Sequence, residues 1–150
     1  MNSEYLALAL EKAQIGAFKG EIPVGAVIVK NNEVIAATYN KKEELGCSTK
    51  HAEILAIEEA SKKLQDWRLT DCDMYLTMEP CLMCCGALIQ ARIRNVYYVL
   101  SNNKFGGINF IKYLNKFEKY NHNVNYVKIE DEKIEKELEN LMKTFFMDKR

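Results

Sequence analysis

Two short motifs combine residue types that can hold a metal ion and move a proton. The first is H-A-E at residues 51–53, and the second is P-C-L-M-C at residues 80–84. Each opens a segment whose apolar spacing is helical. Residues three apart share a helix face, so Cys81 and Cys84 can bind one ion together. Two thiolates and the imidazole of His51 leave the fourth position of a tetrahedral zinc open, as in catalytic sites.

Glu53 is the candidate proton carrier. Bound zinc makes water acidic enough to supply hydroxide near neutral pH, and a nearby carboxylate can carry the proton to a leaving group. Residues two apart do not share a helix face, which argues against Glu53 as a metal ligand beside His51. The sequence therefore predicts one Zn²⁺ per chain, held by His51, Cys81 and Cys84, with Glu53 as the catalytic residue.

Each motif alone allows other interpretations. A C-x-x-C pair could be a redox pair or two buried cysteines, and an H-x-E could be a helix cap and a surface acid. Redox chemistry would leave His51 unexplained. A structural zinc usually needs four protein ligands, and His122 is the only other histidine. It stands in a polar loop, where we interpret it as a turn, surface or RNA-contacting residue. Cys47, Cys72 and Cys85 are interpreted as packing residues.

Composition limits the remaining functions. The 150 residues are 48% hydrophobic and 28% charged, which predicts one globular domain over residues 1–150. Net charge is zero, so attraction to RNA must come from local patches such as Lys143 with Lys149 and Arg150, or Arg92 with Arg94. No signal peptide and no apolar run of roughly 20 residues is present. The odd number of cysteines argues against a disulfide framework and for a reducing compartment. Together, these features favour a cytoplasmic protein without a membrane partner.

Hydrophobic periodicity predicts alternating helices and strands. In chain order, these are a helix over 3–18, strands over 24–29 and 34–39 with a turn at Asn31-Asn32, a polar loop over 40–50, a helix over 50–64 capped by Ser48 or Thr49, a strand over 74–78, a helix from Pro80 to about Ala91, a strand over 96–100, a helix over 108–117, a strand over 124–129 and a helix over 132–147. This order implies an α/β fold in which a mixed five-stranded sheet is flanked by helices on both faces.

H-x-E followed by P-C-x-x-C resembles the signature of the zinc cytidine and adenosine deaminases. Over most of its length the chain is similar to bacterial tRNA-specific adenosine deaminases (TadA-like). The similar segments are E-I-P-V-G-A-V at 21–27, T-M-E-P-C-L-M-C at 77–84, G-A at 86–87, Q-A-R-I at 90–93, N-H-N-V at 121–124 and F-F at 145–146.

The resemblance implies a three-layer α/β/α cytidine-deaminase-like fold and hydrolytic deamination of adenosine to inosine at the wobble position of a tRNA anticodon. It also implies a homodimer, and the apolar helix faces around Leu82, Met83 and Ile89 favour one. Substrate contacts are expected from Asn40, which could also be a turn former, and from the closing helix. The candidate substrate-binding residues are Asn40, Val24, Ala52, Pro80, Phe145 and Phe146. Adjacent helical positions lie about 100° apart, so one of the two phenylalanines should be exposed.

Two loops depart from the family pattern. Residues 47–50 read C-S-T-K where the family usually has D-P-T-A, and residues 101–107 read S-N-N-K-F-G-G in place of an Asp and a K-x-G-A loop. The main alternative is a free-base or nucleoside deaminase, acting on guanine or cytosine, because such enzymes share the motif and fold. A small-molecule enzyme needs a lid over its pocket, whereas an RNA enzyme needs an open site with basic and aromatic neighbours.

Overall fold

One mixed sheet of five strands forms the centre of the fold. The computed structural model describes residues 3–148. In the order β2-β1-β3-β4-β5, the sheet contains β2 (Glu33–Tyr39), β1 (Gly25–Lys30), β3 (Cys72–Met78), β4 (Asn95–Leu100) and β5 (Asn125–Lys128). Strand β1 is antiparallel to β2 and β3, whereas β3, β4 and β5 are parallel. The carboxyl ends of the parallel strands therefore lie together at one end of the sheet, which is where ligands bind in open α/β sheets.

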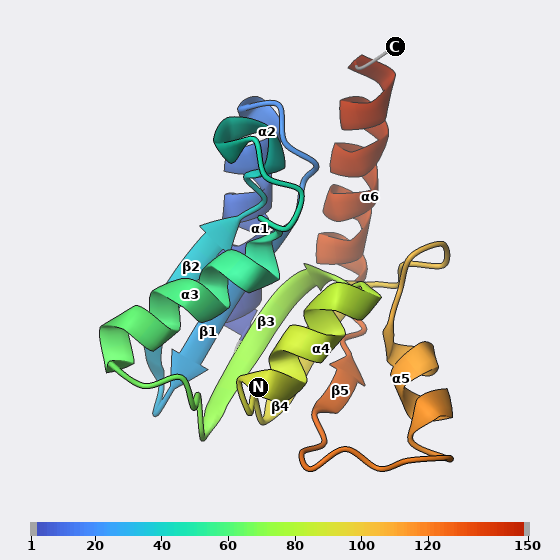
Figure 1. Ribbon diagram of the computed structural model, residues 1–150. Coiled ribbons are helices and arrows are strands. Elements are labelled where there is room, and N and C mark those ends of the chain that lie inside the picture. Colours follow the sequence, from blue (N-terminus) through green and yellow to red (C-terminus); the bar gives the residue numbers. More distant parts are fainter. Residues whose placement is uncertain (1–2, 149–150) are drawn as a thin grey trace.

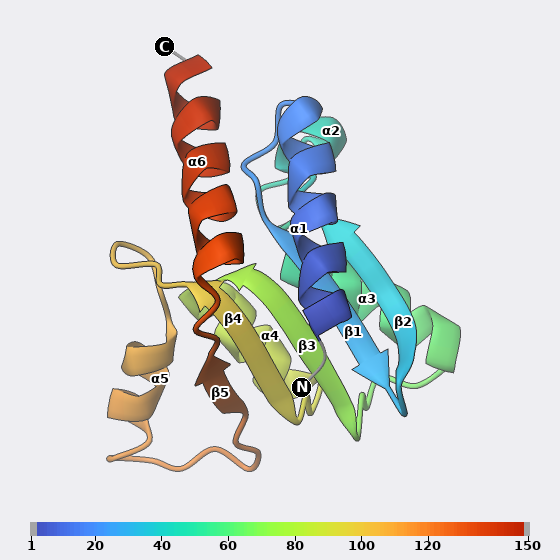
Figure 2. The ribbon, with the colours of Figure 1, turned by 180° about the vertical axis from the view of Figure 1, so that it is seen from behind.

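Helices cover both faces of the sheet (Figures 1 and 2). They are α1 (Ser3–Phe18), α2 (Lys42–Leu45), α3 (Ala52–Leu64), α4 (Leu82–Gln90), α5 (Ile108–Leu114) and α6 (Glu132–Asp148). Helices α3 and α4 lie on one face, α1 and α6 on the other, and α5 stands beyond β5. The three-layer α/β/α fold is thus confirmed. Among residues 3–148, none of the helices is long and apolar enough to cross a bilayer.

Apolar side chains pack on each side of the sheet and hold the layers together. The cluster under α3 and α4 includes Ile28, Ala56, Leu76 and Leu88, and the cluster under α1 and α6 includes Leu6, Val27, Val99 and Leu138. Strand β1 contributes alternately to both, since consecutive strand residues point to opposite faces. Both faces of the central strands are therefore buried.

The hairpin between β1 and β2 turns at Asn31 and Asn32, as predicted. Their φ angles are 51° and 62°. A two-residue loop with positive φ at both positions matches the twist of the flanking strands, and asparagine tolerates this conformation better than most residues.

A short helix, α2, forms inside the segment predicted to be a loop. The buried carboxylate of Glu21 accepts hydrogen bonds from the backbone N–H groups of Glu43 and Glu44. At the other end, Gly46 has φ 56° and its N–H donates to the carbonyl of Glu43, while the N–H of Cys47 donates to that of Lys42. The stabilising carboxylate is more than twenty residues away in the sequence, so local pattern could not reveal this helix.

Helix boundaries at the site also differ from the prediction. Helix α3 has His51 as its N-cap, and α4 has Cys81. Ser48 and Thr49 instead belong to the turn before α3, and Pro80 precedes the N-cap of α4 rather than opening the helix. Away from the site, α5 ends at Leu114, three residues earlier than expected. Both corrections at the site put a motif residue at the N-cap.

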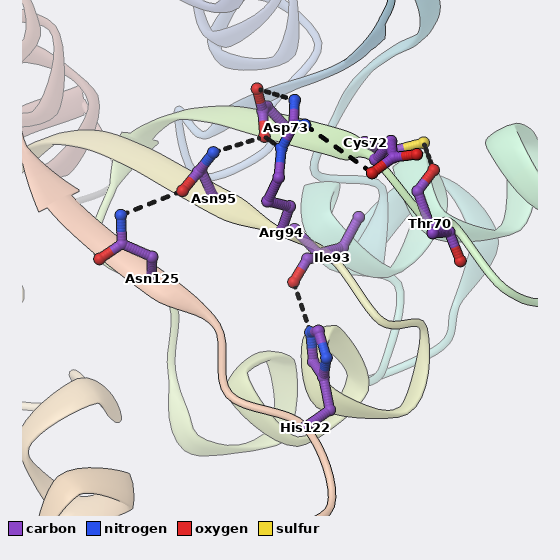
Figure 3. Close-up of polar contacts among 9 residues, drawn as sticks. Thr70, Cys72, Asp73, Ile93, Arg94, Asn95, His122 and Asn125 are labelled. Atoms are coloured by element: carbon purple, nitrogen blue, oxygen red, sulfur yellow. Dashed lines mark hydrogen bonds and ion pairs between the residues drawn. The ribbon is translucent and has the colours of Figure 1, made fainter.

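At the opposite end of the sheet, polar side chains join the starts of β3, β4 and β5 (Figure 3). Asp73 accepts hydrogen bonds from Arg94 Nε at 3.0 Å and from Asn95 Nδ2 at 2.9 Å. Asn95 Oδ1 in turn accepts one from Asn125 Nδ2 at 3.0 Å. This polar row lies far from the carboxyl ends of the parallel strands.

Candidate active site

Three potential metal ligands converge from two helix starts. The Nδ1 atom of His51 lies 3.7 Å from the sulfur of Cys81 and 3.6 Å from that of Cys84. The three ligand atoms are all within 4.8 Å of one another. Two sulfurs and one imidazole nitrogen are the donor set that suits Zn²⁺, and three protein ligands leave room for a water. The side chains therefore fit a catalytic zinc.

The N-cap positions explain how the side chains meet. An N-cap side chain usually bonds to backbone N–H groups of its own first turn. Neither His51 nor Cys81 makes such a bond, and both have extended backbone angles, with ψ of 155° and 174°. Their side chains are consequently available to each other. Cys84 then lies one turn into α4, on the same helix face as Cys81.

Hydrogen bonding distributes charge unequally within this cluster. A hydrogen bond from Cys84 lowers the pKa of the Cys81 thiol to about 4, despite partial burial. The same contact, with burial, raises the pKa of Cys84. The hydrogen bond with Cys81 also raises the pKa of His51. Cys81 is therefore the preferred thiolate, and a metal ion that binds here displaces the protons that the three groups share.

Glu53 is a buried carboxyl group beside the cluster. It is only 4% exposed and stands in the first turn of α3, two residues after His51. Burial is the main cause that raises its pKa. A carboxyl group with a raised pKa can accept and return a proton nearer neutral pH than an exposed one, as general acid–base chemistry requires.

The cluster opens into a cavity of about 550 Å³. Its walls include most of the residues that the motifs and the resemblance single out. These are Val24, Asn40, His51, Glu53, Cys81 and Phe146. Val24 and Asn40 are also joined directly, since the backbone N–H of Asn40 donates to the carbonyl of Val24 at 3.3 Å. The hairpin and the two helix starts thus share one hollow.

Three candidate substrate-binding residues are not among the described residues that line this cavity. Ala52 is fully buried, and its carbonyl accepts a hydrogen bond from Thr38 Oγ1 at 2.7 Å. Pro80 is buried, and its carbonyl accepts the N–H of Gly107 at 2.9 Å. Phe145 lines a separate hollow of about 300 Å³ between the C-terminal ends of α1 and α6. Ala52 and Pro80 are therefore buried next to cavity-lining residues, whereas Phe145 belongs to another part of the surface.

The two phenylalanines of α6 have different surroundings. Phe146 is 49% exposed and lines the main cavity, whereas Phe145 is partly buried beside α1. The expectation that one of them is exposed is therefore confirmed. Lys149 and Arg150, the proposed basic end of this helix, lie outside the described residues 3–148.

His122 lies at the far end of the sheet and not at the cluster. Its Nε2 atom makes a 2.7 Å hydrogen bond with the carbonyl of Ile93 (Figure 3). This bond ties the segment before β5 to the turn after α4. The structure thus gives His122 a structural contact in the loop before β5.

The cysteines outside the cluster are not all packing residues. Cys72 and Cys85 are fully buried, as expected. Cys47, in contrast, is partly exposed, and its sulfur lies 3.4 Å from Thr49 Oγ1. It stands in the turn before α3, where no apolar cluster covers it.

Several wall residues were not anticipated from the sequence. They are Ile22, Lys42, Met78, Glu79, Asn102, Phe105 and Met142. For Asn102 and Phe105 a signal was available, because they follow β4 and the ends of neighbouring parallel strands lie together. Lys42 and Met142 reach the cavity through α2 and α6, and their positions depend on packing that no local pattern reveals.

Comparison with known proteins agrees with this geometry. The model of the MafB19-like deaminase family matches residues 2–150. The tRNA-specific adenosine deaminase of Streptococcus pyogenes serotype M1 is 40% identical over 142 residues, which cover 95% of this chain and 81% of the relative. The chain belongs to the tRNA-specific adenosine deaminase family. Family membership confirms the resemblance that the two motifs and the further similar segments indicate.

Solved structures extend the comparison to the whole fold of this deaminase. A structure from work on A-to-I editing by tRNA:A34 deaminases superimposes with a TM-score of 0.85 at 33% identity, covering 93% of this chain and 99% of that one. A guanine deaminase from Bacillus subtilis superimposes with a TM-score of 0.67 at 31% identity, covering 87% of each chain. The fold is thus shared by deaminases that are named for different substrates. The substrate of this chain must therefore be inferred from the residues around the cavity.

Proposed function

We propose that this protein deaminates adenosine to inosine at the wobble position of a tRNA anticodon. The observation that carries the proposal is the convergence of the His51, Cys81 and Cys84 side chains beside a cavity that is lined by His51, Cys81 and the buried Glu53. The rim of the same cavity carries the exposed ring of Phe146. Family membership supports the same substrate, since relatives bear the name tRNA-specific adenosine deaminase.

The proposal includes one Zn²⁺ per chain, held by His51, Cys81 and Cys84. When bound in a site with three protein ligands, zinc lowers the pKa of water to about 7 and so makes hydroxide available near neutral pH. Nδ1 is the atom of His51 that faces the two sulfurs. The two N-cap positions hold the ligands on separate helices, so folding brings them together.

Glu53 moves the protons of the reaction. Water supplies the oxygen that bonds to C6 of adenine, the bond from C6 to the amino nitrogen breaks, and ammonia leaves. Glu53 takes a proton from the water and delivers it to the departing amino group. Its burial keeps bulk water away from this transfer and raises its pKa. The carboxyl group returns to its starting state when ammonia is released.

An RNA substrate must present an unpaired base to this cavity. Recognition of RNA loops uses splayed bases that stack on aromatic side chains. Phe146 offers such a face at the rim, and Lys42 places a cation on the wall. Asn40 is 5% exposed on the same wall, where its amide can bond to the edge of the base. These contacts favour a nucleotide within RNA over a free base.

Deamination of guanine is the competing function, because the Bacillus subtilis guanine deaminase is 31% identical to this chain. A single assay separates the two. The purified protein is incubated with guanine, cytosine, adenosine and a tRNA that bears adenosine at the wobble position, and inosine and ammonia are measured. The proposal expects inosine in the tRNA; ammonia from guanine alone would contradict it.

The proposal also includes a homodimer that acts in the cytoplasm. Leu82 and Met83, at the start of α4, are 45% and 38% exposed, which leaves apolar area for a second copy to cover. Ile89 does not belong to this surface, contrary to our expectation, because it is buried against α5. Of the three residues named for this surface, only Leu82 and Met83 in the first turn of α4 are therefore exposed.

A further inference from the structure

We propose that Phe105, on the loop after β4, is a specificity-determining residue on which a nucleotide next to the reacting adenosine stacks. The inference rests on the proposed tRNA deamination and adds a substrate contact to it. Phe105 belongs to the segment 101–107, whose sequence departs from the family pattern. The family pattern therefore gives no role for Phe105, and its role has to be inferred from the structure.

Phe105 exposes its ring at the active-site cavity. The residue is 66% exposed and lines the same cavity as Glu53 and Cys81. Phe146 reaches this cavity from α6, so two aromatic side chains from distant parts of the chain stand at one site. Phe105 belongs to none of the three apolar clusters. Packing within the chain does not account for an aromatic side chain here.

Hydrogen bonds hold the loop in one conformation. The carboxylate of Glu79 accepts the backbone N–H of Asn102 at 3.1 Å. The side-chain oxygen of Asn102 accepts the N–H of Phe105 at 3.0 Å, and its carbonyl accepts the N–H of Gly106 at 2.9 Å. The backbone of Phe105 is thus connected, through Asn102, to the residue that stands two positions before the metal ligand Cys81.

Two glycines let the loop lie directly against the start of α4. A Cβ atom on Gly106 would collide with the carboxylate of Glu79, and one on Gly107 would collide with the backbone of Leu82. Gly106 also forms a β-bridge with Cys81. An aromatic ring on such a fixed loop loses little conformational freedom when a ligand stacks on it, which favours binding.

The chemistry beside the ring identifies the ligand as a nucleotide. The ammonium of Lys104 lies 5.4 Å from the centre of the Phe105 ring. A ring face suits any base, and a neighbouring cation suits a phosphate. A free base that occupies the cavity has neither a flanking base nor a phosphate. The pair Lys104 and Phe105 therefore fits a nucleotide that is joined to the reacting adenosine.

A double-mutant cycle between protein and RNA tests the contact. The RNA is an anticodon stem-loop with adenosine at the wobble position, alone or with one flanking nucleotide replaced by an abasic residue. We expect Phe105→Ala to lower kcat/KM on the intact stem-loop by about 5- to 150-fold, the range for loss of one stacked base. An abasic residue at the contacted position should lower the wild-type value similarly, yet cause little further loss in the variant.

Three variants complete the design. Phe105→Leu keeps apolar bulk without a ring and should lose activity like alanine, whereas Phe105→Trp should retain it. Phe117→Ala removes a ring that is 73% exposed and does not line the cavity, and it should have no effect. Zinc content and thermal unfolding should match the wild type in all of them.

The outcomes separate this inference from the proposed function. Two results would refute the stacking contact while tRNA deamination stands, provided that the wild type is active on the stem-loop. In the first, Phe105→Ala and Phe105→Leu leave kcat/KM unchanged. In the second, these variants lower kcat/KM by the same factor on the intact stem-loop and on every abasic stem-loop. If the wild type does not deaminate the intact stem-loop, both ideas are overturned together.

Discussion

The carboxylate of Glu21 accepts a 2.7 Å hydrogen bond from the backbone N–H of Glu44. Its other oxygen accepts the N–H of Glu43 at 3.0 Å, and the Glu21 side chain is almost fully buried. The first residue of the helix held in this way is Lys42, which lines the cavity. A residue that does not itself line the cavity thus positions one of its walls.

Loss of this carboxylate should affect both stability and activity. We expect Glu21→Ala to lower the free energy of unfolding by about 1.5–3 kcal/mol, the range for hydrogen bonds to a charged group. Deamination should fall as well, because α2 loses its anchor. Chemical denaturation measures the first effect. Glu59→Ala, at an exposed position of α3, is the matched control and should stay within about 0.5 kcal/mol of wild type. Equal stability of the two variants would argue against the anchoring role.

Metal content is the most direct test of the ligand cluster. The purified protein should contain one zinc per chain, and Cys81→Ala or Cys84→Ala should lose both zinc and stability, because site formation and folding are coupled. Cys47→Ala removes a thiol outside the cluster and should keep its zinc. Elemental analysis gives the stoichiometry. A wild-type value near zero after metal-replete purification would refute the zinc site.

Glu53 should be required for turnover and dispensable for metal binding. Glu53→Ala should lower kcat by about 10²- to 10⁴-fold, the usual contribution of a general acid–base group. Zinc content should remain unchanged, since proton transfer and not ligation is its proposed role. Glu53→Gln, which keeps the shape without the titrating group, should be equally inactive. Near-normal turnover in either variant would assign the protons to another residue.

The neighbouring phenylalanines of α6 should differ in their effect on tRNA. Phe146→Ala should weaken tRNA deamination by roughly 5- to 150-fold if its ring stacks on a base. Phe145→Ala should change activity much less, because Phe145 lines the hollow beside α1. Steady-state kinetics on the same tRNA compare the two. The reverse order of effects would move RNA recognition to the other side of α6.

Self-association should depend on the first turn of α4. Analytical ultracentrifugation at micromolar concentration should give the mass of a dimer. Met83→Asp places a charge on the exposed apolar surface and should shift the mass toward the monomer. Lys112→Asp, a charge reversal on α5, serves as a control for added negative charge. A wild-type protein that is monomeric and active would remove the dimer from the proposal.

Local spacing is enough to predict some of the site. Cys84 is three positions after Cys81, so helical geometry alone puts their side chains on one face. The approach of His51 is different, because it lies thirty residues before Cys81 in the sequence. The donor set that a catalytic zinc needs, and not the spacing, joins these halves. The sheet order then explains the approach, since α3 and α4 pack on the same face.

Other features depend on contacts between distant segments. Helix α2 exists because Glu21 satisfies its first N–H groups, and no residue within the predicted loop indicates this. Met142 reaches the cavity because α6, after β5, contacts β4 and runs alongside α1. Propensity and periodicity describe short segments, and they contain no information about contacts between segments that are far apart in the sequence.

The polar row at the start of the parallel strands has a consequence for how β5 is aligned. Strand β5 has only four residues, and its burial alternates weakly, so hydrophobic burial specifies its pairing poorly. Asn125 pairs directly with Asn95, which pairs with Asp73. A slip of β5 by one residue would separate the two amides and turn every β5 side chain to the opposite face. This exposed amide-to-amide hydrogen bond therefore adds to the packing of Tyr126 in fixing the alignment of this edge strand and of the chain that continues from it into α6.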